Sequence, residues 1–221
     1  MAFTDELEMV AEPIWEATLA HPMVEGLGDG SLEVEPFRYW VRQDYRFLEE
    51  YCRVFAFGAA RAPDLDRLRT FAELLTATAE EEMDLHRAYA AEFEIDAADL
   101  EATTPSPTTR AYTDFMIRTA ATGTFGDLVA VLLPCMWGFN ETASRLAAEG
   151  LPDEERYAEW IRTYDGEEFT ELTDWCQDLM DEVAADAPEA DRRRYRELFE
   201  TSARYEYRFW DAAWNQETWS V

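Results

Sequence analysis

The stretch PFRYWVRQDYRFLEEYCRVFAFGAA, residues 36–60, shows the pattern that decides the fold. Apolar side chains recur at every third or fourth position, the spacing that places them on one face of an α-helix. Pro36 opens the stretch, at a favoured first-turn position. The apolar face is made by Phe37, Trp40, Val41, Phe47, Leu48, Tyr51, Val54 and Phe55. One position on this face, residue 44, is an aspartate, so the segment predicts an amphipathic helix with an acid on its buried side.

The same spacing continues along the chain in both directions. We expect further helices over residues 4–19, 64–93, 107–122, 125–148, 154–164, 167–184 and 188–214. Ser106 is placed to cap one of them, and Thr124 with Asp127 has the spacing of a capping box. Gly26, Gly28 and Gly30 predict a short loop, and residues 95–107 predict a connector. Since no convincing strand pattern or linker occurs, we predict a single all-α domain, residues 1–221, of two to three helix layers.

The charge balance is strongly acidic. There are 48 Asp and Glu residues against 19 basic residues, all of them arginine, for a net charge of -29. A surface of this sign repels phosphate backbones and anionic lipid, so nucleic acid and membrane surfaces are poor partners. Salt screens the self-repulsion of such a chain, which favours adaptation of a halophilic protein to a salty cytoplasm over an acidic binding site.

Cysteine usage and chain ends indicate the compartment. Three widely spaced cysteines, Cys52, Cys135 and Cys176, form no disulfide framework, which favours a reducing environment. The acidic, amphipathic N-terminus resembles neither a signal peptide nor a transit segment. The longest apolar run, residues 128–134, is far too short to span a membrane. These features predict a cytoplasmic protein.

Three residues place reactive groups on apolar faces. Asp44 interrupts the face of the 36–60 helix, and Glu206 lies between aromatic residues on the inner face of 188–214. Cys135 lies on the apolar face of 125–148, beside Pro134, which we expect to interrupt that helix. A buried carboxylate costs several kcal/mol unless it is paired or hydrogen-bonded, and the chain has no lysine. A polar cavity for a ligand with N–H donors accounts for both acids and suits one of them to proton transfer.

Structural explanations for these residues stay open. Cysteines and aromatic residues on apolar faces are commonly core, which is how we interpret Cys52 and Cys176. Either acid alone could be a capped or water-bridged structural residue. His86 lacks a glutamate three positions before it, where a di-iron site requires one, and Met83 stands there instead. We therefore interpret His86 as a hydrogen-bonded structural residue and His21 as a helix cap, with haem ligation by His21 as the alternative. No metal and no cofactor are expected.

Short stretches in order along the whole chain match one family. The sequence resembles the TenA/thiaminase II family, aminopyrimidine aminohydrolases with a haem-oxygenase-like multi-helix bundle. The matching stretches are HP at 21–22, GLGDG at 26–30, QD at 43–44, FGAA at 57–60, Glu82-Met83 through Leu85-His86, PSPT at 105–108, Tyr112-Thr113, LLPC at 132–135 with Trp137, WIRTY at 160–164 and YEYRFW at 205–210. Because Cys135 is present, the resemblance is to the cysteine-bearing branch.

The resemblance implies an activity and a site. Family members hydrolyse 4-amino-5-aminomethyl-2-methylpyrimidine to the hydroxymethyl pyrimidine and ammonia, and many also cleave thiamine. Residue by residue it implies Cys135 as nucleophile, Glu206 as acid and base, Asp44 on the amino group and adjacent ring nitrogen, Tyr164 on the ring, Tyr112 orienting the Cys–Glu region, and Phe47, Phe139 and Phe209 at the substrate. The partner implied is a small aminopyrimidine or thiamine, and the assembly implied is a homotetramer.

Two departures from the family pattern concern the substrate. Phe47 and Phe139 stand where characterised relatives commonly carry tyrosine. The rings can still stack on a pyrimidine, but any hydrogen bond made by the hydroxyls is lost. Two other classes of function stay open on the same fold, a non-catalytic pyrimidine-binding or regulatory protein and an oxidative enzyme.

Overall fold

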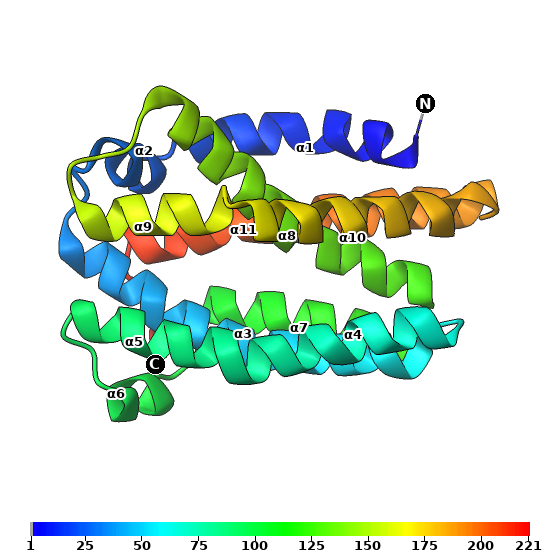
Figure 1. The fold of residues 1–221 in the computed structure, drawn as a ribbon, viewed down its shortest axis with the longest axis horizontal. Helices are drawn as coiled ribbons and strands as arrows, with labels where there is room; N and C mark the ends of the chain where they lie inside the picture. The colour runs from blue at the N-terminus through cyan, green and yellow to red at the C-terminus, as the bar shows by residue number, and fades with distance from the viewer. Residues whose placement is uncertain (1) are drawn as a thin grey trace. The chain divides into compact units, whose positions relative to one another are not determined.

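The computed structural model describes residues 2–221, apart from the side chains of Glu81, Glu82 and Leu85. Its helices are α1 (Phe3–Leu19), α2 (Pro22–Asp29), α3 (Val34–Arg61), α4 (Leu65–Ala77), the π-helical turn η1 (Thr78–Glu82), α5 (Met83–Glu92), α6 (Ala97–Ala102), α7 (Pro107–Thr122), α8 (Phe125–Glu149), α9 (Glu155–Tyr164), α10 (Glu167–Ala185) and α11 (Glu189–Trp214) (Figure 1). No strand occurs among the described residues, so the all-α prediction is confirmed.

The chain divides into two compact units. The first unit comprises the residues up to Glu33 together with Val129–Asp211. The second unit comprises Val34–Leu128 and the C-terminal Ala212–Val221. The long helices α8 and α11 each begin in one unit and end in the other. That the chain is a single domain stays a prediction.

In the second unit α3 is the central helix. Helices α4, α5, α6 and α7 all contact it, and α4 and α7 run alongside it (Figure 1). The apolar face predicted from the sequence is buried and made largely of contacting rings. Phe37 stacks on Trp40 at 5.4 Å and meets Phe93 at 5.0 Å, and Phe71 of α4 lies between Phe55 and Phe125. The periodicity of residues 36–60 thus produces the core of this unit.

In the first unit the core forms around α8. Trp137 contacts Trp15 of α1 at 5.1 Å and Phe199 of α11 at 5.9 Å. Ion pairs also join α8 to α1, since Arg145 binds Glu12 at 2.9 Å and Glu16 at 2.6 Å. Figure 1 shows α8 and α11 running in the same direction.

Two predicted helix starts are confirmed by their hydrogen bonds. The Ser106 hydroxyl accepts the Thr109 amide at 3.2 Å and so caps α7. The Thr124 amide donates to Asp127 at 2.8 Å, and the Asp127 amide donates back to the Thr124 hydroxyl at 3.2 Å. This reciprocal pair is a capping box at the start of α8.

The loop predicted for the glycine-rich stretch is wrong, because most of it is the helix α2. His21 caps this helix through Nδ1, which accepts the Met23 amide at 3.2 Å, as predicted for His21. Gly26 and Gly28 lie inside the helix, where close neighbours leave little room for a side chain. A Cβ at Gly28 would lie 2.6 Å from the Leu146 side chain. Gly30 then ends the helix in the left-handed conformation, with φ of 79°.

Three further details differ from the expected helix boundaries. The connector contains the short helix α6, capped by Asp96, whose carboxylate accepts the Asp99 amide at 2.8 Å. The helix expected over 64–93 is divided by the π-helical turn η1. Pro134 lies inside α8 and does not end it, although proline removes one hydrogen bond of the helical ladder.

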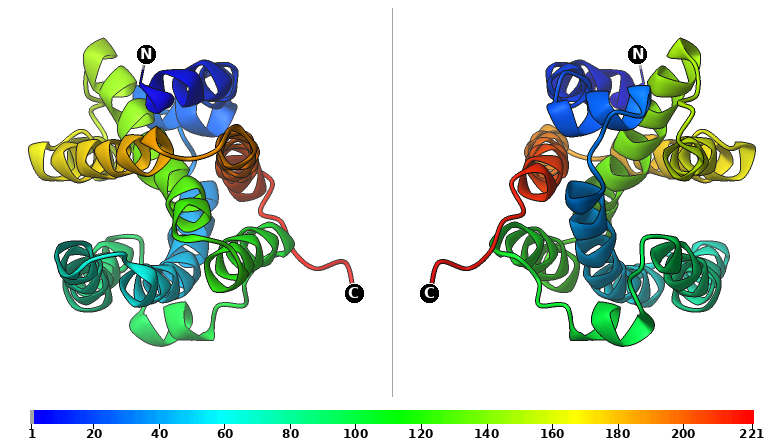
Figure 2. Two further views of the ribbon diagram at one scale, coloured as in Figure 1. Left: turned by 90° about the vertical axis from the view of Figure 1, so that its right-hand side faces the viewer. Right: turned by 90° about the vertical axis from the view of Figure 1, so that its left-hand side faces the viewer.

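The C-terminal segment continues beyond α11 and contacts the beginning of α7 (Figure 2). The Glu217 carboxylate accepts the Thr108 amide at 2.8 Å, and the Glu217 carbonyl accepts the Tyr39 hydroxyl at 2.7 Å. A carboxylate is stabilising at a helix N-terminus, so this segment supports the start of α7.

We expect Gly58→Ala to destabilise the protein by about 1–3 kcal/mol, because overpacking a well-packed core costs about that much. A Cβ at Gly58 would overlap the Phe71 ring, which is fully buried and cannot move aside. Gly138→Ala is the matched control, since its Cβ would make an ordinary contact with Trp15 at 3.5 Å. Urea unfolding at fixed salt measures both. A Gly58→Ala variant as stable as Gly138→Ala contradicts this account of the α3–α4 contact.

Candidate active site

Two contacts within the first unit fix the register of α8 against α11. The buried Ser202 hydroxyl donates to the Val131 carbonyl at 2.8 Å, across a sequence separation of 71 residues. Further along the two helices, the rings of Phe139 and Trp210 lie 5.6 Å apart, and these two residues have the same separation in sequence as Val131 and Ser202. Two parallel helices therefore advance together by two turns between these contacts.

Cys135 and Glu206 lie midway between those two contacts. Cys135 is one helical turn beyond Val131 on α8, and Glu206 is one helical turn beyond Ser202 on α11. Cys135 and Glu206 are therefore as far apart in sequence as the residues of each contact. Cys135 is half-buried and Glu206 is 8 % exposed, so both belong to the inner side of their helices, as the sequence predicts. Together the register and the burial bring the thiol and the carboxylate to one level of the first unit.

An aromatic cluster continues this inner side. Phe139 lies 5.1 Å from Tyr164 and 5.8 Å from Trp160, measured between ring centroids. Trp160 in turn lies 5.5 Å from Trp210. Phe209 is buried on the same helix as Glu206, and Tyr164 is half-buried. The first unit thus contributes flat apolar rings and one phenol beside the thiol and the acid, a surface that suits a flat heterocycle.

Asn140 positions Tyr164 and was not predicted from the sequence. Its side-chain amide donates to the Tyr164 carbonyl at 2.8 Å and to the Thr170 hydroxyl at 3.0 Å. These bonds fix the end of α9 on α8. The available signal was an amide side chain next to Phe139, directly after the apolar run of this helix.

The second unit holds the remaining predicted residues, Asp44, Phe47 and Tyr112. All three are buried, and the Phe47 and Tyr112 rings lie 5.2 Å apart. Asp44 and Phe47 are one turn apart on α3, and Tyr112 comes from α7. The second unit therefore brings an acid, a phenyl ring and a phenol together across α3 and α7.

Gln43, the residue before Asp44, connects α3 to the start of α7. Its carbonyl oxygen accepts the Ser106 amide at 2.9 Å and the Thr109 hydroxyl at 2.7 Å, and its NH₂ group donates to the Thr104 carbonyl at 3.2 Å. This satisfied buried amide fixes the helix that carries Tyr112. Sequence periodicity alone gave no reason to select Gln43.

Other features of the described residues lie outside the predicted site. His86 is buried and hydrogen-bonded, as expected for a structural histidine. An open groove of about 360 Å³ is lined by Pro13, Ile14, Ala17, Arg204, Tyr207 and Arg208, and it includes none of the predicted site residues. Within residues 2–221, no three His, Cys, Asp or Glu side chains gather as a metal site. None of the helices described is long and apolar enough to cross a bilayer.

Comparison with known proteins identifies the family. The model of the TENA/THI-4/PQQC family matches residues 9–216. The chain belongs to this family. Aminopyrimidine aminohydrolase of Halalkalibacterium halodurans is 43 % identical over 221 residues, covering 100 % of this chain and 99 % of the relative. The protein of the same name from Bacillus subtilis is 38 % identical over 220 residues, covering 100 % of this chain and 93 % of the relative.

Solved structures confirm the fold of this TenA family member. A TenA homologue from P. horikoshii superposes with a TM-score of 0.90 at 28 % identity, covering 97 % of this chain and 99 % of that one. A domain from Shewanella denitrificans, described as having a heme oxygenase-like fold, superposes with a TM-score of 0.75 at 15 % identity, covering 96 % and 92 % of the two chains. The predicted haem-oxygenase-like bundle is therefore confirmed.

Cys135 and Cys176 should react very differently with an alkylating reagent. Cys176 is fully buried, and burial raises the pKa of its thiol to about 12, so little thiolate exists at pH 8. We expect iodoacetamide at that pH to modify Cys135 and to leave Cys176 intact, as read by peptide mass spectrometry. Protein unfolded in urea is the control, in which all three react. Equal labelling of Cys176 and Cys135 in the native protein contradicts the burial described.

Proposed function

We propose that this TenA family member is an aminopyrimidine aminohydrolase that converts 4-amino-5-aminomethyl-2-methylpyrimidine and water to the hydroxymethyl pyrimidine and ammonia in thiamine salvage. Full-length similarity to two proteins named for this activity supports the reaction. The single observation that carries the assignment of residues is the register of α8 and α11, which sets Cys135 level with Glu206. Thiamine is proposed as a second substrate.

The proposed reaction uses the thiol as a covalent catalyst. The Cys135 thiolate adds to a ring carbon of the pyrimidine, and the displaced electron pair expels the amine from the exocyclic methylene. Glu206 protonates that amine, so ammonia leaves, and its carboxylate then takes a proton from water as the hydroxide adds to the methylene. Return of the electron pair restores the aromatic ring and expels the thiolate.

The pyrimidine must be activated for this addition. A neutral aminopyrimidine becomes electrophilic when its ring nitrogens are protonated or hydrogen-bonded, which is the role proposed for Asp44 and Tyr164. The burial of Asp44 supports this role, because a hydrogen bond to a buried acid is little weakened by competing water. Tyr112 is proposed to orient the groups around the thiol, and Phe47, Phe139 and Phe209 to stack on the substrate.

The two phenylalanines that replace common tyrosines have definite contacts. Phe47 packs on Tyr51 at 5.3 Å as well as on Tyr112, and Phe139 packs on Tyr164. The rings therefore retain an aromatic environment without a hydroxyl of their own. We propose that this changes substrate preference and rate and leaves the reaction type unchanged.

The setting of the reaction is also proposed. In residues 2–221 none of the three cysteines forms a disulfide, which supports a reducing cytoplasm. Met9, Leu65 and Leu68 are exposed apolar side chains, at 62 %, 56 % and 40 %, which supports assembly, and a homotetramer is the state proposed. The net charge of -29 supports function at high salt, so ammonia release should be measured across a salt series.

We expect Cys135→Ser to reduce ammonia release from the aminomethyl pyrimidine by at least about 10³-fold, because the thiolate forms the covalent bond. Binding of the product pyrimidine should change by less than about threefold, since a serine preserves the shape of the site. Cys52→Ser is the matched control, the same change at another half-buried cysteine. Undiminished ammonia release by Cys135→Ser removes Cys135 from catalysis. A wild-type protein that binds the pyrimidine but releases no ammonia favours a regulatory role.

We expect Asp44→Asn to weaken binding of the product pyrimidine by about 10- to 100-fold, the cost of losing a hydrogen bond to a charged or acidic group. Calorimetry at molar salt measures this affinity. Asp114→Asn, at an exposed position of α7, is the control and should bind as the wild type does. An unchanged affinity of Asp44→Asn places Asp44 outside the binding site.

A further inference from the structure

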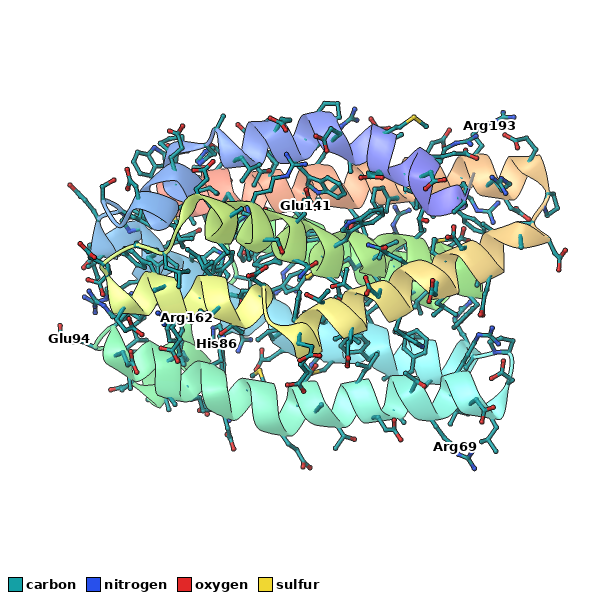
Figure 3. The ribbon with its side chains drawn as sticks, turned by 45° about the horizontal axis from the view of Figure 1, so that its top comes forward. Arg69, His86, Glu94, Glu141, Arg162 and Arg193 are labelled. Atoms are coloured by element: carbon teal, nitrogen blue, oxygen red, sulfur yellow. The ribbon has the colours of Figure 1, made fainter. Side chains whose placement is uncertain are left out.

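His86 is held in one orientation against α3. It is 8 % exposed and lies in the first turn of α5, where Figure 3 labels it. Its Nε2 lies 2.9 Å from the Val41 carbonyl. A carbonyl oxygen can only accept a hydrogen bond, so Nε2 carries a hydrogen and donates it. That bond fixes the ring, with its other nitrogen directed away from Val41.

The other nitrogen of the ring faces Asp44. His86 Nδ1 lies 3.7 Å from Asp44 Oδ2, and both side chains are buried. When Nε2 carries the hydrogen of a neutral imidazole, Nδ1 presents a lone pair. A lone pair facing a carboxylate oxygen is repulsive unless a proton lies on one of the two atoms. Burial lowers the pKa of the His86 imidazole, an effect that its bond to Val41 opposes, so the ring favours the neutral form.

Among the side chains that the structure describes around His86, two arginines have partners of their own. On the elements packed against α5, Arg87 binds the Tyr45 hydroxyl at 2.9 Å, and Arg42 of α3 lies 3.9 Å from Asp99 of α6. Glu80 of η1 is exposed. On α7, Tyr112 packs on Phe47. A proton shared by Asp44 and His86 would lie on one of the two facing atoms, Oδ2 of Asp44 or Nδ1 of His86.

The π-helical turn η1 immediately precedes His86. A π-helical turn holds one extra residue, so it changes the direction in which every following side chain of the helix points. Turns of this kind are rare and are frequently found at functional sites. Because η1 ends four residues before His86, it sets which face of α5 is presented to α3.

We propose that His86 is a positioning residue for pyrimidine recognition. His86 and Asp44 together hold one proton, and Asp44 presents this proton to the ring nitrogen beside the 4-amino group. This inference rests on the proposed function, in which Asp44 binds the aminopyrimidine. Asp44 transfers the stored proton to the ring nitrogen, and the resulting carboxylate accepts hydrogen bonds from that N–H and from the amino group, which an asparagine cannot do. When the product leaves, the proton returns to the pair, with His86 Nδ1 as its second acceptor, so no net proton is consumed.

The variant His86→Gln tests this role. A glutamine NH₂ can still donate to the Val41 carbonyl, but the variant has no basic nitrogen facing Asp44. Without that acceptor Asp44 loses its proton at lower pH than in the wild type. The affinity for the ligand therefore falls at a pH where Asp44 of the variant is ionised. We expect at least about tenfold weaker binding of the product pyrimidine than wild type at pH 8, and a difference below about twofold at pH 5.5. Calorimetry in buffers of unlike ionisation enthalpy should show His86→Gln taking up more protons on binding than wild type at pH 8.

The control is the other buried histidine of the chain. His21→Asn preserves an acceptor for the Met23 amide and should leave the pH profile of binding unchanged. A His86→Gln profile parallel to wild type at every pH overturns the proton-storing role while leaving the proposed function in place. A wild type that binds no aminopyrimidine at any pH overturns the proposed function itself.

A measurement on the wild-type protein covers the case in which His86→Gln does not fold. Nitrogen-15 NMR of the His86 ring, assigned with the help of His21→Asn, reports the hydrogen on each ring nitrogen separately. We expect Nε2 to remain protonated throughout and the Nδ1 signal to move when the product pyrimidine is added. An Nδ1 signal that is unaffected by saturating pyrimidine overturns the inference.

Discussion

One buried hydrogen bond, from the Ser202 hydroxyl to the Val131 carbonyl, sets the register of the two helices that carry Cys135 and Glu206. It joins two helices that run in the same direction, and the Phe139–Trp210 contact two turns later keeps them in the same register. The residues between the two contacts are Cys135 and Glu206. A shift of α11 by one residue would turn the carboxylate about 100° away from the thiol, because consecutive residues of a helix are separated by that angle.

In the second unit the corresponding constraint is the burial of an acid, Asp44, in a chain that has no lysine. Asp44 has a neutral imidazole beside it, and that ring is fixed by its bond to the Val41 carbonyl. An arginine in that place would keep the acid ionised, so the acid would have no proton to give to a ligand. An imidazole offers the acid a second atom that can hold a proton, which suits a ligand that must receive a hydrogen bond at one atom and donate one at the next.

The sequence predicted most of the fold because helix caps and periodicity are local. The stripe of residues 36–60 and the caps at Ser106 and Thr124 are in place. The failures have tertiary causes: the glycines of α2 were interpreted as a loop, yet they are needed where Leu32 and Leu146 approach the helix. The π-helical turn η1 leaves no mark in the apolar spacing. For the site, periodicity indicated Asp44, Glu206 and Cys135, whereas the other roles came from family resemblance, and Gln43 and Asn140 were found only through their hydrogen bonds.

The central claim is that Glu206 faces the thiol of Cys135, and the pH dependence of Cys135 alkylation in wild type and Glu206→Gln tests it most directly. A carboxylate beside a thiol disfavours the thiolate, so its removal should let the reactive form appear at lower pH. The account predicts that the midpoint of the rate profile of Glu206→Gln lies at lower pH than that of wild type, while Glu197→Gln, at an exposed position of α11, leaves it in place. Superimposable profiles for wild type and Glu206→Gln would contradict the claim.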